Sequence, residues 1–383
     1  MKNFLKYPNN LDGSGGVEFG GVPRTQRAVG DGAFFDAYAF EGQFFYFIDM
    51  DNDELRRCDV TLSGEDLGVS LKGILEYASS IVLADGLIFT GAHIFNGRDL
   101  SLQWSVLDSL LEMETSDVED LKKTMSEIAE VGYSDGKFYR VYDKARPELG
   151  LLEIDPESRS ISRIYIPSSS FVFLNDESIV SQFGHNLARF QRDGYLSWEF
   201  GFEFRESYKL ERSIGFSVLG EKVLGYSTQG ECVVLDTSSG SVIWSFQLRD
   251  VIDWEYPEES VVIAGVVTNE RVAIFKVRGG AQCIFAVDLS DGALLWLEKE
   301  ESFTLKIGHC IAGDLLFTKV AGSETYPYAL DCYTGETVWS EKSTKRDFAI
   351  CVASNRHVLY LTTYFDGIAF DWNDPYVSPH RPQ

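Results

Sequence analysis

The sequence predicts an all-β fold of repeated four-stranded antiparallel sheets, which is the architecture of a β-propeller. Three observations lead to this prediction. A short phrase of residues recurs about every 46 residues along the 383-residue chain, two hairpin patterns fit into each interval, and the longest interval contains a helical pattern. Hydrophobic residues make up 44% of the chain and aromatic residues 14%, so a large folded core is expected rather than a disordered chain.

The recurring phrase is an apolar run, an Asp, three residues, a Gly, three residues and a Trp. It occurs three times with identical spacing, as Asp236, Gly240 and Trp244, as Asp288, Gly292 and Trp296, and as Asp331, Gly335 and Trp339. The phrase is typical of a hairpin, because Asp accepts hydrogen bonds from turn amides, Gly supplies a positive φ, and the returning strand places Trp in the core.

Degenerate copies extend the phrase over the rest of the chain. Phe190, Gly194 and Trp198 keep the spacing without the Asp, and Asn96 and Trp104 keep it without the Gly. The strand and turn pattern alone persists after positions 49, 155 and 371. Anchors at 49, 96, 155, 190, 236, 288, 331 and 371 are separated by 47, 59, 35, 46, 52, 43 and 40 residues. These eight anchors cover the chain.

A second hairpin pattern precedes most anchors, and 80–89, 131–139 and 216–224 are clear examples. Two hairpins in about 46 residues make four strands, which matches one propeller blade. The last unit, 348–372, has room for three strands, and 14–27 could supply the fourth and remove an exposed edge. This closure favours eight blades, with seven as the alternative, in a single domain of residues 1–383 that ends in a tail at 374–383.

The Asp, Gly and Trp phrase resembles the PQQ-like repeats of quinoprotein dehydrogenase-type propellers, which also occur in non-catalytic scaffold proteins. The resemblance implies the fold, with Trp244, Trp296 and Trp339 packed between neighbouring blades. Catalytic members hold their quinone with a vicinal disulfide, a stacked Trp and a calcium ion, and they work after export. No two cysteines are adjacent here, so we expect a non-catalytic member with no cofactor and no metal.

The interval after Asn96 is too long for a blade, and the excess at 105–130 is expected to be an acidic helical insertion. Apolar residues recur at helical spacing over 106–111, and 116–119 has the form of a capping box. Its candidate partner-binding residues are Asp117, Glu119 and Asp120. A second acidic and aromatic stretch adds Asp253, Trp254, Glu255, Tyr256 and Glu258. A solvated surface segment without a partner is the alternative for both.

Three other motifs are interpreted as turns or a flexible segment. The G-x-S-x-G match at 132–136 is flanked by strands, whereas a hydrolase elbow lies between a strand and a helix. The D-x-D-x-D run at 49–53 continues with Glu54 where a calcium loop needs Gly. The Gly-rich start at 13–18 follows no strand. The five histidines share no ligand spacing.

The formal net charge of -25 opposes binding to nucleic acid or to an anionic membrane and favours a basic protein. The first residues reach Pro8 without an apolar stretch, so a cytoplasmic location is expected, and the six separated cysteines are expected to be free thiols.

The favoured function is therefore a non-enzymatic propeller that binds a basic protein, such as an immunity or inhibitor protein that neutralises a toxin. Two alternatives are a ligand-binding or enzymatic propeller that uses the central channel, and a scaffold of an envelope complex.

Overall fold

The computed structural model describes residues 5–6, 17–19, 38–41, 44–49, 53–59, 66–72, 81–113, 125, 131–143, 146–204, 214–252, 261–279, 283–299, 310–319, 326–340, 348–354, 357–362, 367–372 and 378–381. The chain, expected from its sequence to form one domain, divides into two compact units, one of Met1–Val22, Val60–Gly64 and Phe202–Gln383 and one of Pro23–Asp59 and Glu65–Gly201. The two units are described one at a time.

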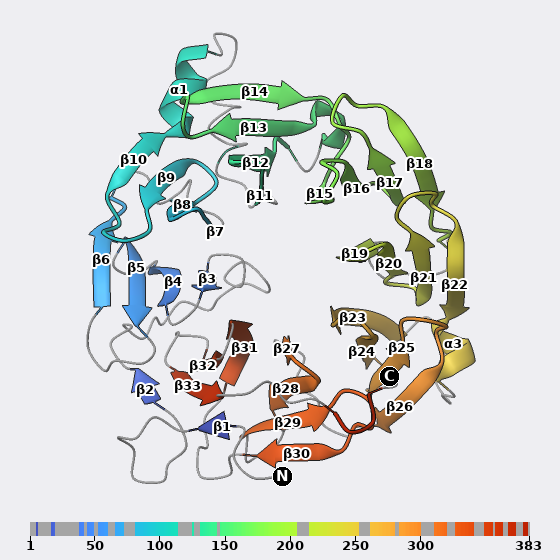
Figure 1. The fold of residues 1–383 in the computed structure, drawn as a ribbon. Helices are drawn as coiled ribbons and strands as arrows, with labels where there is room; N and C mark the ends of the chain where they lie inside the picture. The colour runs from blue at the N-terminus through green and yellow to red at the C-terminus, as the bar shows by residue number, and fades with distance from the viewer. Residues whose placement is uncertain are drawn as a thin grey trace. The chain divides into compact units, whose positions relative to one another are not determined.

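The unit of Pro23–Asp59 and Glu65–Gly201 contains four sheets of four antiparallel strands in chain order (Figure 1). Their strands are β3 (Tyr38–Glu41), β4 (Phe44–Asp49), β5 (Glu54–Asp59) and β6 (Asp66–Ser70); β7 (Val82–Ala84), β8 (Leu87–Phe89), β9 (His93–Asn96) and β10 (Leu102–Ser105); β11 (Val131–Ser134), β12 (Lys137–Val141), β13 (Leu151–Asp155) and β14 (Ser160–Ile164); and β15 (Ser170–Phe173), β16 (Ile179–Phe183), β17 (Asn186–Phe190) and β18 (Leu196–Gly201). The first strands β3, β7, β11 and β15 are neighbours in that order.

The other unit has three more four-stranded sheets. They are β19 (Ile214–Leu219), β20 (Lys222–Ser227), β21 (Glu231–Asp236) and β22 (Val242–Gln247); β23 (Val261–Thr268), β24 (Val272–Gly279), β25 (Cys283–Asp288) and β26 (Leu294–Lys299); and β27 (Cys310–Ala312), β28 (Leu315–Lys319), β29 (Pro327–Asp331) and β30 (Thr337–Ser340). A further sheet joins β31 (Phe348–Ser354), β32 (His357–Thr362) and β33 (Gly367–Trp372) to two N-terminal strands. These are β1 (Leu5–Lys6) and β2 (Val17–Phe19), and both pair antiparallel with β33.

The predicted all-β propeller of four-stranded antiparallel blades is confirmed. The described residues contain seven complete four-stranded blades, and the last three strands are completed by chain from the N-terminal end. Strand β2 lies inside the segment 14–27 that the sequence offered as a closing strand. The described helices are α1 (Val106–Met113), α3 (Leu248–Val251) and the 3-10 turn Pro147–Leu149, and none is long and apolar enough to cross a membrane.

Each repeated hairpin turns through a residue with positive φ. Six such residues follow the third strand of a described blade, namely Leu100 (φ 57°), Arg159 (φ 52°), Gly194 (φ 90°), Gly240 (φ 69°), Gly292 (φ 77°) and Gly335 (φ 71°). The anchor that the sequence predicts at position 49 instead ends the second strand of its blade, and Asp53 (φ 54°) lies in the hairpin between β4 and β5. The anchor side chain organises the same turn, since Oδ1 of Asp236 accepts the amides of Ser238 and Ser239 at 3.1 and 2.8 Å. The degenerate copies therefore keep the backbone of the turn after losing the Gly.

One anchor lies a residue later than the spacing suggested. In the β17–β18 hairpin the amide of Gly194 donates to the carbonyl oxygen of Gln191 (2.9 Å), and the amide of Gln191 donates to that of Tyr195 (2.8 Å). Gln191, rather than Phe190, therefore occupies the anchor position, and this turn is one residue shorter than the three Asp-anchored turns.

Trp244 and Trp296 lie between neighbouring sheets. Nε1 of Trp244 donates to the carbonyl oxygen of Leu289 (3.1 Å), and Nε1 of Trp296 donates to that of Cys332 (2.8 Å). Each acceptor is the residue after the Asp anchor of the next blade. A Cβ placed on Gly335 would lie 2.8 Å from Cδ2 of Trp296, so the ring rests directly on the glycine of that next turn. We call this contact the tryptophan latch.

In five described blades a β-bulge determines on which face of the fourth strand the tryptophan side chain lies. The pairing of the fourth strand with the third shifts by one residue just before Trp104, Trp198, Trp244, Trp296 and Trp339. Strand β14 has Arg163 at the corresponding position and pairs with β13 without a shift. Because side chains alternate between the two faces of a strand, the missing bulge moves Arg163 to the opposite face.

The cores lie between successive sheets and are rich in large apolar side chains. One cluster joins the sheets β19–β22 and β23–β26 through Val234, Trp244, Phe275 and Phe285, all buried. The Phe275 and Phe285 rings stack with centroids 4.9 Å apart. The described cysteines Cys58, Cys232, Cys283, Cys310 and Cys332 are free thiols, as predicted, and the side chain of Cys351 lies outside the described residues.

Candidate functional site

The predicted partner-binding residues lie outside the described residues. They are Asp117, Glu119 and Asp120 in the insertion, and Asp253, Trp254, Glu255, Tyr256 and Glu258 in the second acidic stretch. The structure instead describes the base from which each of these two segments leaves the fold.

The insertion starts from a fixed base. Helix α1 follows β10 directly, as the helical spacing at 106–111 predicts, and the carbonyl oxygen of Ala92 accepts the amides of Val106 (3.0 Å) and Leu107 (3.2 Å). Nε1 of Trp104 donates to Oγ of Ser109 (2.9 Å), so this tryptophan contacts the helix. Val106 and Leu107 are buried, which places one face of α1 in the core.

The end of the insertion is attached to the following sheet through a buried arginine. Arg140 of β12 has no exposed surface, and its guanidinium donates to the carbonyl oxygen of Met125 (3.2 Å) and to the sulfur of the same residue (3.2 Å). Met125 is also fully buried. The insertion is therefore held at both sides, by α1 on the sheet β7–β10 and by Met125 on the sheet β11–β14.

The second acidic stretch leaves from helix α3. The amide of Leu248, whose side chain is buried, donates to the carbonyl oxygen of Gly230 (2.7 Å), and Ile252 closes the helix by donating to Leu248 (3.0 Å). Asp250 is exposed beside Arg249. Residues 253–260 follow immediately after this anchored turn.

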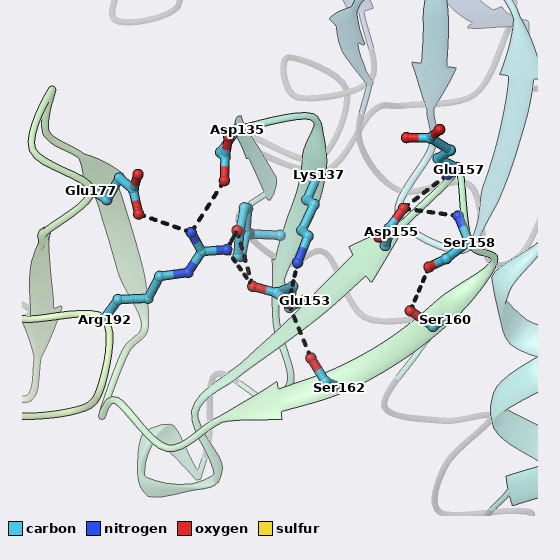
Figure 2. A network of polar contacts seen from close by, with 11 residues as sticks. Asp135, Lys137, Glu153, Asp155, Glu157, Ser158, Ser160, Ser162, Glu177 and Arg192 are labelled. Atoms are coloured by element: carbon cyan, nitrogen blue, oxygen red, sulfur yellow. Dashed lines mark hydrogen bonds and ion pairs between the residues drawn. The ribbon is translucent and has the colours of Figure 1, made fainter.

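A polar cluster joins the sheets β11–β14 and β15–β18 at the place where a tryptophan latch is missing (Figure 2). Nη2 of Arg192 donates to Oε2 of Glu153 and to the hydroxyl of Tyr139, both at 2.8 Å. Lys137 donates to Oε1 of Glu153 (2.7 Å), and the Ser162 hydroxyl donates to the same oxygen (3.3 Å). Glu153 therefore has two cationic partners, one from each sheet.

The register of β13 with β14 explains why the polar cluster lies where other junctions have a tryptophan latch. Glu153 stands two residues before the Asp155 anchor, where Val234 stands in the blade of Trp244. Ser162 pairs with Glu153, whereas Trp244 pairs with Val234. At this junction a carboxylate and a hydroxyl thus replace an aliphatic side chain and an indole, and Arg192 of the next turn contacts them in place of a glycine.

The environment fixes the protonation states of the cluster. Burial raises the pKa of Glu153, but hydrogen bonds from Lys137, Arg192 and Tyr139 outweigh it and lower that pKa to about 2. Burial, with the nearby charge of Glu153, raises the pKa of Tyr139. The cluster therefore holds a permanent carboxylate and a neutral phenol at physiological pH. Its described groups are suited to electrostatic binding and not to proton transfer near pH 7.

Two further carboxylates extend the cluster to the surface. Nη1 of Arg192 lies 3.4 Å from Oδ2 of Asp135 and 3.1 Å from Oε2 of Glu177, whose side chains are 62% and 59% exposed. Three carboxylates thus share one guanidinium and one ammonium. In the preceding pair of sheets the Tyr133 hydroxyl donates to Asp85, and burial together with this bond raises the pKa of Tyr133 to about 12.

Exposed aromatic side chains lie beside this junction. Tyr195 belongs to the same turn as Arg192 and is 70% exposed, and Tyr165, which follows β14, is 71% exposed. A Cβ on Gly194 would lie 3.8 Å from the carbonyl oxygen of Tyr165, so the backbones of the two segments are neighbours. Leu196, next to Tyr195, is also exposed.

Two of the sequence motifs with a chemical alternative lie at hairpins. Residues 132–136 form the β11–β12 hairpin, with positive φ at Asp135 and Gly136, and no helix follows. Asp49 and Glu54 pair across the β4–β5 hairpin. Among the residues that the structure describes, no three His, Cys, Asp or Glu side chains come together as a metal site would require.

Comparison with known proteins relates part of this chain to a known family. A family model described as outer membrane protein assembly factor BamB matches residues 179–341, the part of the chain with the three complete Asp, Gly and Trp phrases. Residues 179–341 are similar to PQQ-like repeats, and the chain folds as a β-propeller. Outside the matched region this propeller keeps the positive-φ turn of the repeat at Leu100 and Arg159. No curated protein sequence matches the propeller significantly.

Solved structures support the fold at low sequence identity. BamB from Moraxella catarrhalis has a TM-score of 0.57 at 11% identity, covering 88% of this propeller and 96% of that chain. Sqt1 from Saccharomyces cerevisiae has a TM-score of 0.58 at 10% identity, covering 98% and 100%. The computationally designed Ika8 protein has a TM-score of 0.57 at 10% identity, covering 88% and 95%.

Proposed function

We propose that this propeller is a non-enzymatic, cytoplasmic binding protein for a basic protein partner, and that it serves as an immunity or inhibitor protein for a cationic toxin. The observation that carries the proposal is the combination of a net charge of -25 with an acidic insertion that starts and ends on buried anchors. A fixed base lets a charged segment present its carboxylates without a large loss of entropy on binding.

The described polar groups support a binding role. Glu153, whose pKa is lowered to about 2, is held ionised by two cations, which is the arrangement of a structural ion pair. The serine of the hydrolase-like motif, Ser134, ends a strand in a hairpin. Acidic surfaces increase the rate of association with cationic partners, and this effect decreases as ionic strength rises.

The test is co-purification from native lysate at low and at moderate salt. The wild type should retain a stoichiometric basic partner, and the variant Asp117→Lys, Glu119→Lys, Asp253→Lys and Glu255→Lys should lose it. The matched control is Glu157→Lys, Glu199→Lys, Glu221→Lys and Glu336→Lys, four exposed acids elsewhere that change the net charge equally. Loss of the partner in both variants would show that binding depends only on the net charge of the chain, and it would contradict the proposed surface.

A second candidate, a scaffold of an envelope complex, is favoured by the match to the family described as an outer membrane protein assembly factor. Fractionation of cells that produce the chain from its natural locus separates the two. Recovery with the envelope would support the scaffold and contradict the cytoplasmic binding protein.

A further inference from the structure

We infer that the junction of the sheets β11–β14 and β15–β18 is a docking site for an arginine of a basic partner segment, with Tyr165 and Tyr195 as stacking surfaces and Asp135 and Glu177 as carboxylate acceptors. The inference rests on the proposed function, because it names a second surface and the residue type that this surface would recognise.

The first argument is the charge balance of the junction. Asp135, Glu153 and Glu177 are three carboxylates, and their cationic partners in the described part of the chain are Arg192 and Lys137. Glu153 takes the short contacts to both cations, whereas Asp135 and Glu177 share one guanidinium nitrogen at 3.4 and 3.1 Å. The outer two carboxylates are therefore incompletely neutralised and accessible to a further cation.

The second argument is the exposed aromatic surface on the same turn. Tyr195 is three residues from Arg192, and Asp193 fixes the backbone by accepting the Tyr195 amide (3.0 Å). Burying a mostly exposed phenol ring against a flat guanidinium gives a cation–π contact as well as apolar contact. Tyr165 and Leu196 are also exposed, and the backbone of Tyr165 lies next to that of Gly194 in the same turn as Leu196. These side chains extend the surface that a partner would cover.

The combination selects arginine over lysine. A guanidinium is planar, stacks on aromatic rings and binds carboxylates with two donors, whereas an ammonium is a compact and strongly hydrated charge. The site also has a rigid frame, since Asp135 and Glu177 lie in hairpin turns with positive φ and Arg192 is fixed by Glu153. We therefore expect recognition to depend on the chemistry of the cation and not on charge alone.

The test is calorimetric titration of the full chain with three peptides of twelve residues that alternate Gly with Arg, Lys or Glu, at about 50 mM salt. The wild type should bind the Arg peptide at least about fivefold more tightly than the Lys peptide and should not bind the Glu peptide. Tyr165→Ala with Tyr195→Ala should abolish the Arg preference, and Tyr165→Phe with Tyr195→Phe should retain it.

The carboxylates have their own variant and control. Asp135→Asn with Glu177→Gln should weaken the Arg peptide by at least about fivefold, and Glu221→Gln with Glu336→Gln, the same change of charge on exposed turns elsewhere, should weaken it by less than about twofold. Equal weakening by the two pairs, or equal affinity for Arg and Lys peptides, would overturn the inference. A native partner retained in lysate without any peptide binding would leave the proposed function standing, and peptide binding without a native partner would do the reverse.

Discussion

At the scale of single residues, Gly335 of the repeated turn and Gly220 of the β19–β20 turn separate two reasons for glycine at a hairpin. Both have positive φ, but a Cβ on Gly335 would be 2.8 Å from Trp296, whereas a Cβ on Gly220 would meet nothing within 4 Å. Gly220→Ala should cost about 1 kcal/mol of unfolding free energy from backbone strain alone. Gly335→Ala should cost about 3 kcal/mol because it also displaces the latch. Urea unfolding of both variants measures the difference, and equal losses would show that the latch adds nothing.

His93 gives the molecule a stability that depends on pH. It is buried in β9, and burial lowers its pKa from 6.5 to about 4, although Asp108 opposes the shift. The unfolded chain therefore binds the proton more readily, so this contribution is complete above pH 6.5 and is lost as the pH falls to 4.

The expected loss from His93 between pH 6.5 and 4 is about 3 kcal/mol. The measurement is the unfolding free energy of the wild type and of His93→Gln at intervals over this pH range. The difference between the two proteins gives the contribution of His93, because both share the same carboxylates. The two curves should diverge toward high pH, and parallel curves would contradict a neutral buried His93.

At the scale of the elements, the junction of β11–β14 with β15–β18 should depend on its ion pairs more than the latched junctions do. Glu153→Gln and Arg192→Ala should each lower the unfolding free energy by about 2 kcal/mol, and a double-mutant cycle should give a coupling of about 1–3 kcal/mol. Glu157→Gln, an exposed neighbour shown in Figure 2, should change it by less than about 0.5 kcal/mol. Because the pKa of Glu153 is about 2, the coupling should persist at pH 4.5 and fall only below it. A coupling near zero would assign the junction to apolar packing.

These elements also show what the sequence can and cannot predict. The strands and turns were readable because Asp, Gly and Trp have distinct backbone and packing roles at fixed spacing, as at Asp236, Gly240 and Trp244. The cluster at Glu153 was missed because it depends on the absence of a bulge between β13 and β14, which spacing does not reveal. The replacement of Trp by Arg163 was the signal that this junction differs. The predicted surface at Asp117 and Trp254 stays a prediction.

At the scale of the whole molecule, the two ends of the chain contribute to one sheet. Strand β2 pairs with Gly367–Ala369 and β1 pairs with Asp371–Trp372, so the two N-terminal strands together cover the edge of β33. An uncovered β33 would present free backbone donors and acceptors, which favours association between chains.

Graded deletions test this role of the N-terminal strands. Removal of residues 1–13 takes away the two β1 residue pairs and should cost about 1–2 kcal/mol of unfolding free energy, whereas removal of 1–22 takes away both strands and should cost about 2–4 kcal/mol. Only the longer deletion should produce concentration-dependent oligomers in sedimentation velocity, because it alone exposes the edge at Gly367–Ala369. The substitution Ile368→Lys would make pairing of β33 with a second chain unfavourable. It should therefore suppress the oligomers of the 1–22 deletion without restoring its stability. Equal behaviour of both deletions would place the stabilising contact in β1, and monomers throughout would show that β33 needs no cover.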